Sequence, residues 1–327
     1  MKKITLIPLI IIIVGVCLAF AGFAAGGMQI PWVDRDGWHT SRGHSNLGAL
    51  ITVDETYKGV KAIDVRVDFV DRVTFKEGSE FAVRGQNYER LGGLKAENSD
   101  GVLKVDATRD KRLRGISLSD WQSWLADDTW IEITYPKNAG LGAVSVEIGA
   151  GQLSVNGISA DKLDIVNDFG NVEVTDAGTG TMSVNLSAGD VKVANVSADT
   201  LKIINDFGKI TLDGASADSL TIKNSAGDIR ADSVNTGLLD VVSDFGSVRF
   251  GNLVFSGKAE IDQNSGEVEL KLDMSEADVS YELTTSAGSV NVDGRKSGGS
   301  VINRNSGAAA NLIVNSDFGG INVKFLK

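Results

Sequence analysis

Four Asp-Phe-Gly triplets are the first candidates for chemistry, because this triplet holds magnesium in protein kinases. They begin at Asp168, Asp206, Asp244 and Asp317. The sequence has no glycine-rich phosphate loop, no strand lysine in a VAIK setting and no HRD catalytic loop, all of which a kinase needs. A triplet that recurs four times is typical of a repeated turn, and we interpret it as structural.

A set of carboxylates is the second candidate. The repeat described below predicts that they lie at equivalent outward positions of consecutive coils, where they would form an acidic strip: Asp240, Glu260, Asp262 and Glu282. Such a strip could bind calcium or a cationic polymer, since calcium prefers carboxylate oxygens. It is also the only feature that favours a β-helix carbohydrate-active enzyme. We favour a solvated face, because charged residues keep solenoids soluble.

The sequence offers few other reactive groups. His39 and His44 are its only histidines, and Cys17 is its only cysteine, within an apolar segment. A Ser-His-Asp triad, a thiolate metal site and a disulfide are therefore not expected in the region that follows. We predict no catalytic residues, no metal, no cofactor and no enzymatic activity.

The amino terminus predicts an attachment to a membrane. Residues 4–25 are uncharged and follow Lys2 and Lys3, and as a helix they would cross a hydrocarbon core of roughly 30 Å. We assign residues 1–26 to a transmembrane anchor, or to a signal peptide cleaved after the Ala-Phe-Ala of residues 19–21. Residues 27–47 are expected to form a juxtamembrane stalk. The remaining chain would then lie outside the cytoplasm, anchored by a single pass.

Glycines spaced by 19 residues organise most of the chain, which has 38 glycines and three prolines. The regular series is Gly151, Gly170, Gly189, Gly208, Gly227 and Gly246. It continues with steps of 20, 22, 19 and 12 at Gly266, Gly288, Gly307 and Gly319, which indicates insertions or merged strands at the distal end. Repeats of this length are typical of solenoids.

Apolar residues alternate on both sides of each glycine. Around Gly208 they are Leu201 and Ile203 before it and Ile210 and Leu212 after it. A third inward position follows seven residues after each glycine: Ile158, Ala177, Val196, Ala215, Val234 and Leu253. This pattern predicts that each coil has two strands and a hydrophobic corner. We therefore expect an all-β fold, a parallel β-helix with coils of about 19 residues.

Outward charges favour parallel stacking of these coils. Glu173 would lie beside Lys192, and Lys209 between Asp190 and Asp228, so opposite charges would become lateral neighbours. An antiparallel meander of hairpins remains the alternative, although two-residue hairpin signatures such as Asn-Gly are scarce.

The turn residue before the glycine alternates between phenylalanine and alanine. The phenylalanines are Phe169, Phe207, Phe245 and Phe318, and we predict that with the glycines they form the structural turns. Phe207 is expected to fill the corner between Ala188 and Ala226, because one aromatic ring and one methyl group interdigitate without overfilling the space. On this interpretation, loss of Phe207 destabilises the fold more than a change at Gly208, and a change at Lys209 matters least.

The residues before the regular repeat keep a strand pattern without its period. We expect residues 48–143 to form an irregular β-rich cap and residues 144–327 to form the solenoid repeats, since terminal repeats are usually atypical. Residues 109–128 interrupt the pattern with a basic run and helical spacing of Trp121 with Trp124, which indicates a protruding element of unassigned role.

The apolar amino terminus, the WIEITYPKN stretch from 130 to 138 and the repeated G-x-V-x-V strands resemble the bacterial putative-adhesin family of β-strand-repeat proteins. This family is a domain of unknown function related to head domains of autotransporter-like adhesins. The resemblance covers residues 48–325 and implies an exported or membrane-anchored fold without family catalytic residues. It also implies, for some members, a link to envelope-stress sensing.

The expected function is accordingly an extracytoplasmic, membrane-anchored scaffold or adhesin-like binding protein. Its partners would be other envelope proteins or surface polymers. Nucleic acid is not an expected partner, because the net charge is −11 and basic residues form no patch. A carbohydrate-active enzyme and an accessory protein of envelope-stress sensing are the alternatives.

Overall fold

The computed structural model describes residues 32–34, 37–39, 48–109, 128–305 and 307–327. The chain divides into two compact units, Met1–Ser45 and Asn46–Lys327. In the first unit, β1 (Trp32–Asp34) and β2 (Gly37–His39) form an antiparallel pair. The segment expected as an anchor, with Cys17, lies outside the described residues, as does His44. Within the described part of the chain, no helix is long and apolar enough to cross a membrane.

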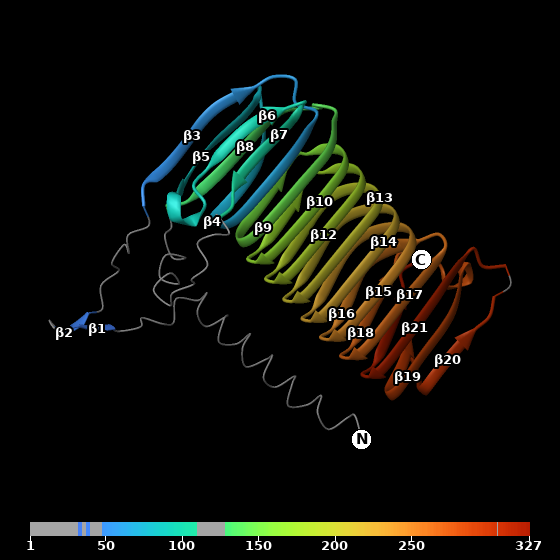
Figure 1. Cartoon of the computed structure of the whole chain (residues 1–327). Helices are drawn as coiled ribbons and strands as arrows, with labels where there is room; N and C mark the ends of the chain where they lie inside the picture. The colour runs from blue at the N-terminus through green and yellow to red at the C-terminus, as the bar shows by residue number, and fades with distance from the viewer. Residues whose placement is uncertain (1–31, 35–36, 40–47, 110–127, 306) are drawn as a thin grey trace. The chain divides into compact units, whose positions relative to one another are not determined.

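The second unit is a parallel β-solenoid (Figure 1). Its regular coils are built from β9 (Leu141–Asn156), β10 (Ser159–Phe169), β11 (Val172–Thr175), β12 (Gly178–Ala188), β13 (Val191–Phe207), β14 (Ile210–Ala226), β15 (Ile229–Phe245) and β16 (Val248–Phe255). Val191 pairs with Ile210, and Ile210 with Ile229, so neighbouring coils are 19 residues apart. The expected parallel stacking is confirmed, and the meander alternative is wrong for this region.

The core is the interior of the stacked coils. Leu201 and Ile203, which precede the corner glycine Gly208, are fully buried, and so are Ile210 and Leu212, which follow it. The third inward position is buried as well in every coil from Ile158 to Leu253. The two strand segments and the corner predicted from the apolar pattern therefore enclose one continuous core along the stack.

The coils continue into the region expected to be an irregular cap. Its strands are β3 (Leu50–Tyr57), β4 (Ala62–Gly78), β5 (Phe81–Tyr88), β6 (Lys95–Ser99), β7 (Val102–Ala107) and β8 (Trp130–Pro136), with a short 3-10 helix at Glu89–Leu91. β4 pairs in parallel with β9, and β7 and β8 pair in parallel with β4. Antiparallel strands then close this end, with β6 on β7, β5 on β8 and β3 on β5. Residues 110–127, which make up most of the protruding element expected at 109–128, lie outside the described residues.

The distal end departs from sequence order. It contains β17 (Lys258–Ser265), β18 (Val268–Leu272), a 3-10 helix at Glu276–Asp278, β19 (Val279–Val292), β20 (Arg295–Asn303), β21 (Ala310–Phe318) and β22 (Ile321–Phe325). The last coil, β21 with β22, lies between β17 with β18 on one side and β19 on the other. β20 closes the stack as an antiparallel strand on β19.

This insertion explains the irregular glycine steps. Gly319 packs against Gly266, and Gly288 packs against Gly319, so the stacked order is Gly246, Gly266, Gly319, Gly288. Gly307 lies in the loop before β21 and belongs to no corner, which corrects its place in the sequence-based series. A fixed step along the sequence cannot identify a coil that is inserted out of order.

Candidate functional site

A ladder of glycines forms one corner of every coil. Gly208 has a φ of 133°, which favours glycine, and a Cβ added there would lie 1.9 Å from the carbonyl oxygen of Gly189. The same approach recurs at each step of the ladder, at 1.8 to 2.4 Å. Glycine is therefore required both for the backbone angle and because the neighbouring coil leaves no room for a side chain.

Buried amides satisfy the carbonyl groups of this ladder. Asn205 Nδ2 donates to Gly189 O at 3.0 Å, and Asn224 Nδ2 donates to Gly208 O at 3.2 Å. Asn205 and Asn224 are almost completely buried. These asparagines, which the sequence pattern did not single out, connect one coil to the next. The Asn-x-x-Gly spacing is the signal that could have indicated this, because a buried polar group needs a partner.

The phenylalanines point out of the coil, so the prediction that they fill the corner is wrong. Phe169 is 45% exposed, Phe245 is 50% exposed and Phe318 is 65% exposed, while Phe207 is half-buried. The backbone turns at the following glycine, and the side chain just before the turn is carried to the outer surface. The inward position is taken instead by the asparagine two residues earlier.

The predicted alternation of ring and methyl group is nevertheless confirmed. Phe207 pairs in register with Ala188 on one side and with Ala226 on the other. The full stacked order, here called the Phe/Ala ladder, is Phe69, Ala150, Phe169, Ala188, Phe207, Ala226, Phe245, Ser265, Phe318 and Ala287. Sequence analysis missed Phe69, whose ring lies 4.3 Å below the Arg109 guanidinium. The alternation continues through the coil that is inserted out of sequence order.

The charged columns beside the ladder pair in two ways. Lys192 Nζ lies 2.8 Å from Glu173 Oε1, as predicted, and this contact raises the pKa of Lys192. Asp190 Oδ1 instead accepts a hydrogen bond from the backbone amide of Lys209 at 2.8 Å. The carboxylate thus holds two corners together through the main chain rather than through the lysine ammonium group.

The acidic strip is divided by the order of the coils, contrary to the sequence-based prediction. Asp240 and Glu260 are neighbours on adjacent strands, but Ile313 lies between Glu260 and Glu282. Asp262 is two residues further along its strand than Glu260 and lies in a different column of outward side chains. Glu260 Oε2 lies 2.7 Å from Lys258 Nζ. Asp262 Oδ1 accepts from the Asn315 amide at 2.9 Å. Among the described residues, no cluster of three or more His, Cys, Asp or Glu side chains could hold a metal ion.

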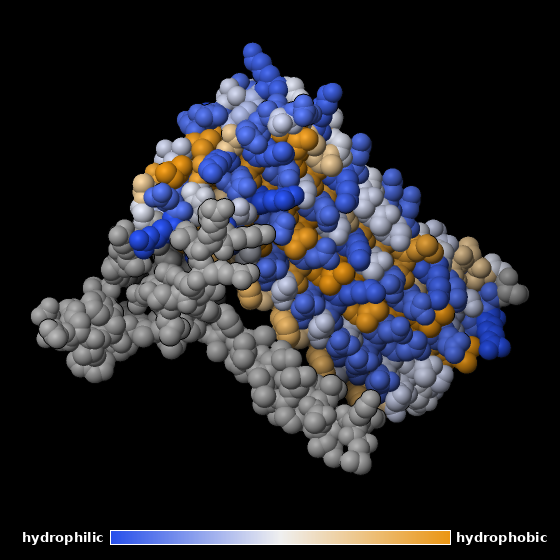
Figure 2. All heavy atoms as spheres, viewed as in Figure 1, coloured by the Kyte–Doolittle hydropathy of each residue, from blue (hydrophilic) through white to orange (hydrophobic). Residues whose placement is uncertain are grey.

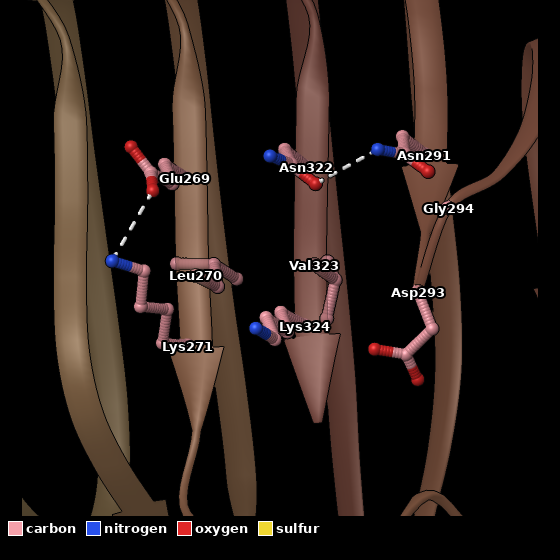
Figure 3. Close-up of a pocket in the computed structure, with 9 residues that line it drawn as sticks. All are labelled: Glu269, Leu270, Lys271, Asn291, Asp293, Gly294, Asn322, Val323 and Lys324. Atoms are coloured by element: carbon pink, nitrogen blue, oxygen red, sulfur yellow. Dashed lines mark hydrogen bonds and ion pairs between the residues drawn. The ribbon is translucent and has the colours of Figure 1, made fainter. Parts of the chain in front are cut away.

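A shallow hollow of about 380 Å³ lies across β18, β22 and β19 at the distal end (Figure 3). Glu269, Asn322 and Asn291 form a row across the three strands. Asn291 Nδ2 donates to Asn322 Oδ1 at 3.2 Å, and Lys271 Nζ lies 3.6 Å from Glu269 Oε1. The hollow combines charges of both signs with amides, a lining that suits polar contact.

Among the described residues, two groups with shifted pKa values take part in hydrogen bonds between distant segments. Burial raises the pKa of Tyr135, whose hydroxyl donates to the carbonyl of Asn156. Glu276 Oε1 accepts from Tyr281 OH at 2.7 Å and from Arg295 at 2.6 Å, and these bonds lower the pKa of Glu276. This contact joins the 3-10 helix, β19 and the turn into β20 at the distal end.

Comparison with known proteins finds one matching family and several similar solved structures. The model of a family described as Toastrack DUF4097 matches residues 60–324. A solved structure of a putative adhesin from Parabacteroides distasonis is 13% identical, covers 85% of this chain and 98% of its own, and has a TM-score of 0.47. Putative adhesins from Bacteroides fragilis and Parabacteroides merdae are 12% and 13% identical, with TM-scores of 0.41 and 0.43. They cover 84% and 86% of this chain and 97% of their own. The search of curated proteins returned no match.

Proposed function

Because the chain belongs to the Toastrack DUF4097 family, whose model spans its solenoid, we propose that it is a non-catalytic, adhesin-like binding scaffold displayed outside the cytoplasm. The observation that carries this proposal is the outer surface of the solenoid. Equivalent outward side chains of successive coils form long columns at the spacing of β-strands, about 4.8 Å. A surface of this kind offers one extended, repetitive binding face rather than a single reaction centre.

The composition of that surface supports binding to other envelope components. Hydrophilic side chains cover most of the visible face, with apolar residues in rows between them (Figure 2). Neither histidine belongs to the described solenoid, and the inserted coil separates Glu282 from the other members of the acidic strip. The observations therefore favour a scaffold over the carbohydrate-active enzyme, and we propose no catalytic residues.

The apolar segment at residues 4–25 supports the proposed location. With Lys2 and Lys3 retained in the cytoplasm, a single span would place the solenoid on the outer side of the cell membrane. Other envelope proteins or surface polymers are then the proposed partners.

Protease treatment of intact protoplasts tests this location. We expect the solenoid to be exposed to added protease and to stay with the membrane fraction until protease is added. A solenoid that is protected until the protoplasts are lysed would contradict the proposed orientation. Its release without protease would contradict the anchor and indicate a cleaved signal peptide.

A turnover assay tests the non-catalytic part of the proposal. The full chain is incubated with acidic polysaccharides beside a variant in which Glu260, Asp262 and Glu282 are replaced by alanine. We expect no turnover from either protein. Turnover by the parent that is lost in the variant would establish the enzyme alternative.

A further inference from the structure

The Phe/Ala ladder is an apolar edge in which large and small residues alternate. Phe245 and Phe318 are at least half exposed and Phe207 is half-buried, whereas the positions between them hold Ala226 and Ser265. Successive phenylalanines are two coils apart, about 9.6 Å at the strand spacing. Each small residue therefore forms the floor of a gap between two aromatic rings. Such a surface has the shape of one half of a zipper.

We propose that the ladder binds the same ladder of a second copy of this chain, with the two solenoids antiparallel. Each Phe, Ala or Ser position of the ladder, together with its coil, is here called a rung. A two-fold axis between the Phe207 and Ala226 rungs places Phe207 over Ala226 of the second copy. The same operation places Phe245 over Ala188 and, further out, Phe318 over Ala150. Every one of these rings enters a gap above an alanine. An interface of this kind is self-complementary, as a closed two-fold dimer requires.

The polar column next to the ladder fits the same arrangement. Aspartates occur on the phenylalanine rungs, as at Asp206, and serine or asparagine on the small-residue rungs, as at Ser225, except for Gly149 beside Ala150. The two-fold axis brings Asp206 opposite Ser225 of the second copy, and Asp244 opposite Ser187. Both of these carboxylates then face a hydrogen-bond donor instead of another carboxylate, while Asp317 lies opposite Gly149.

The column on the other side of the ladder adds opposite charges at the centre. Lys209 and Asp228 are both exposed, and the two-fold axis brings Lys209 of each copy opposite Asp228 of the other. A parallel two-fold pair would instead place ring against ring, leaving the alanine gaps empty. Shape therefore favours the antiparallel direction, and the charges at its centre are complementary.

The area of the ladder predicts a weak or moderate affinity. A buried phenylalanine ring removes on the order of 200 Å² from water, so half-exposed rings supply roughly 100 Å² each. Three rings from each copy, with the surfaces that cover them, bury about 1,200 Å² in total, at the lower limit of specific interfaces. A lipid surface fits less well, because the aspartate column and the net charge of −11 would be repelled by anionic headgroups.

Site-directed cross-linking tests the proposal on the full chain. Two differently tagged chains, both with Cys17→Ser, carry Ser187→Cys or Asp244→Cys; they are co-expressed and oxidised with copper phenanthroline after lysis without detergent. We expect the disulfide between the two chains to exceed either same-position disulfide at least fivefold. Phe207→Asp in both chains should abolish it. Leu238→Asp, which changes another exposed apolar side chain away from the ladder, should leave it unchanged.

Each other result would overturn the proposal. Dominant same-position disulfides would place the two-fold axis at a different level of the stack, and a disulfide that survives Phe207→Asp would place the contact elsewhere. No disulfide above the level of the Phe207→Asp sample would show that the ladder does not bind a second copy. The test does not depend on where the chain resides, so it can fail while the proposed location and binding role stand.

Discussion

A methyl group at one corner glycine should destabilise the solenoid more than the loss of a whole aromatic ring beside it. In Gly208→Ala the new Cβ would lie 1.9 Å from the Gly189 carbonyl oxygen. Ordinary contact begins near 3.4 Å, so the two coils would have to separate there by about 1.5 Å. The φ of 133° adds strain on the order of 1 to 3 kcal/mol for a residue other than glycine.

That separation also breaks the hydrogen bonds that cross the corner. Gly189 N donates to Phe207 O at 2.9 Å, and Asn205 Nδ2 donates to Gly189 O at 3.0 Å. Each contributes about 1 kcal/mol net. Together with the backbone strain, the expected cost of Gly208→Ala is about 3 to 5 kcal/mol in the free energy of unfolding.

Urea denaturation, compared with a matched control, measures this cost. Gly178→Ala introduces the same methyl group in the same solenoid, but no atom lies within 4 Å of the new Cβ and the backbone angle is not left-handed. It should change stability by less than about 1 kcal/mol. Hydrogen exchange in Gly208→Ala should rise first in the adjacent coils, because coils couple mainly to their neighbours. Equal effects of the two substitutions would refute the close-approach argument.

Three further outcomes are expected. Phe207→Ala should cost about 1 kcal/mol, because the ring is half-buried, whereas Ile203→Ala should cost about 2 to 5 kcal/mol; comparable midpoints in urea would contradict the outward placement of Phe207. Lys192→Ala should leave the urea midpoint almost unchanged at high salt, because its ion pair with Glu173 is exposed, and a large shift would show a structural role for the pair. The ionised Glu276 carboxylate, whose pKa is lowered, stabilises the distal end; this contribution is complete above the ordinary carboxyl pKa and is lost as the pH falls through the lowered pKa. Hydrogen exchange in β19 and β20 should therefore rise in acid in the parent but show no such dependence in Glu276→Gln.

The regular part of the fold could be predicted because each coil repeats the same local requirements. A glycine every 19 residues, with Ile210 and Leu212 alternating after it, determines both the corner and the buried face. Parallel stacking follows, since no coil can bury its apolar side chains alone. The register of Val191 with Ile210 is the one expected from these residues.

The remaining features depend on contacts between distant segments. Nothing local in residues 310–325 indicates that this coil enters the stack ahead of β19, and the acidic strip was predicted wrongly for this reason. The orientation of Phe207 was also misjudged, because an alternating pattern does not show where the backbone turns. Asn205 beside it was overlooked, since a buried asparagine and a turn asparagine have the same sequence signal.

Binding of the chain to whole cells tests the central claim most directly. Beads carrying the full chain in lipid nanodiscs are mixed with intact cells of the organism that produces it, beside beads carrying Gly208→Ala, in which the solenoid is destabilised. We predict that the parent beads are retained on the cell surface, that the variant beads are not, and that the surface polymer recovered from the parent beads keeps its original length. Equal retention of both proteins, or progressive shortening of the recovered polymer, would contradict a non-catalytic, adhesin-like scaffold.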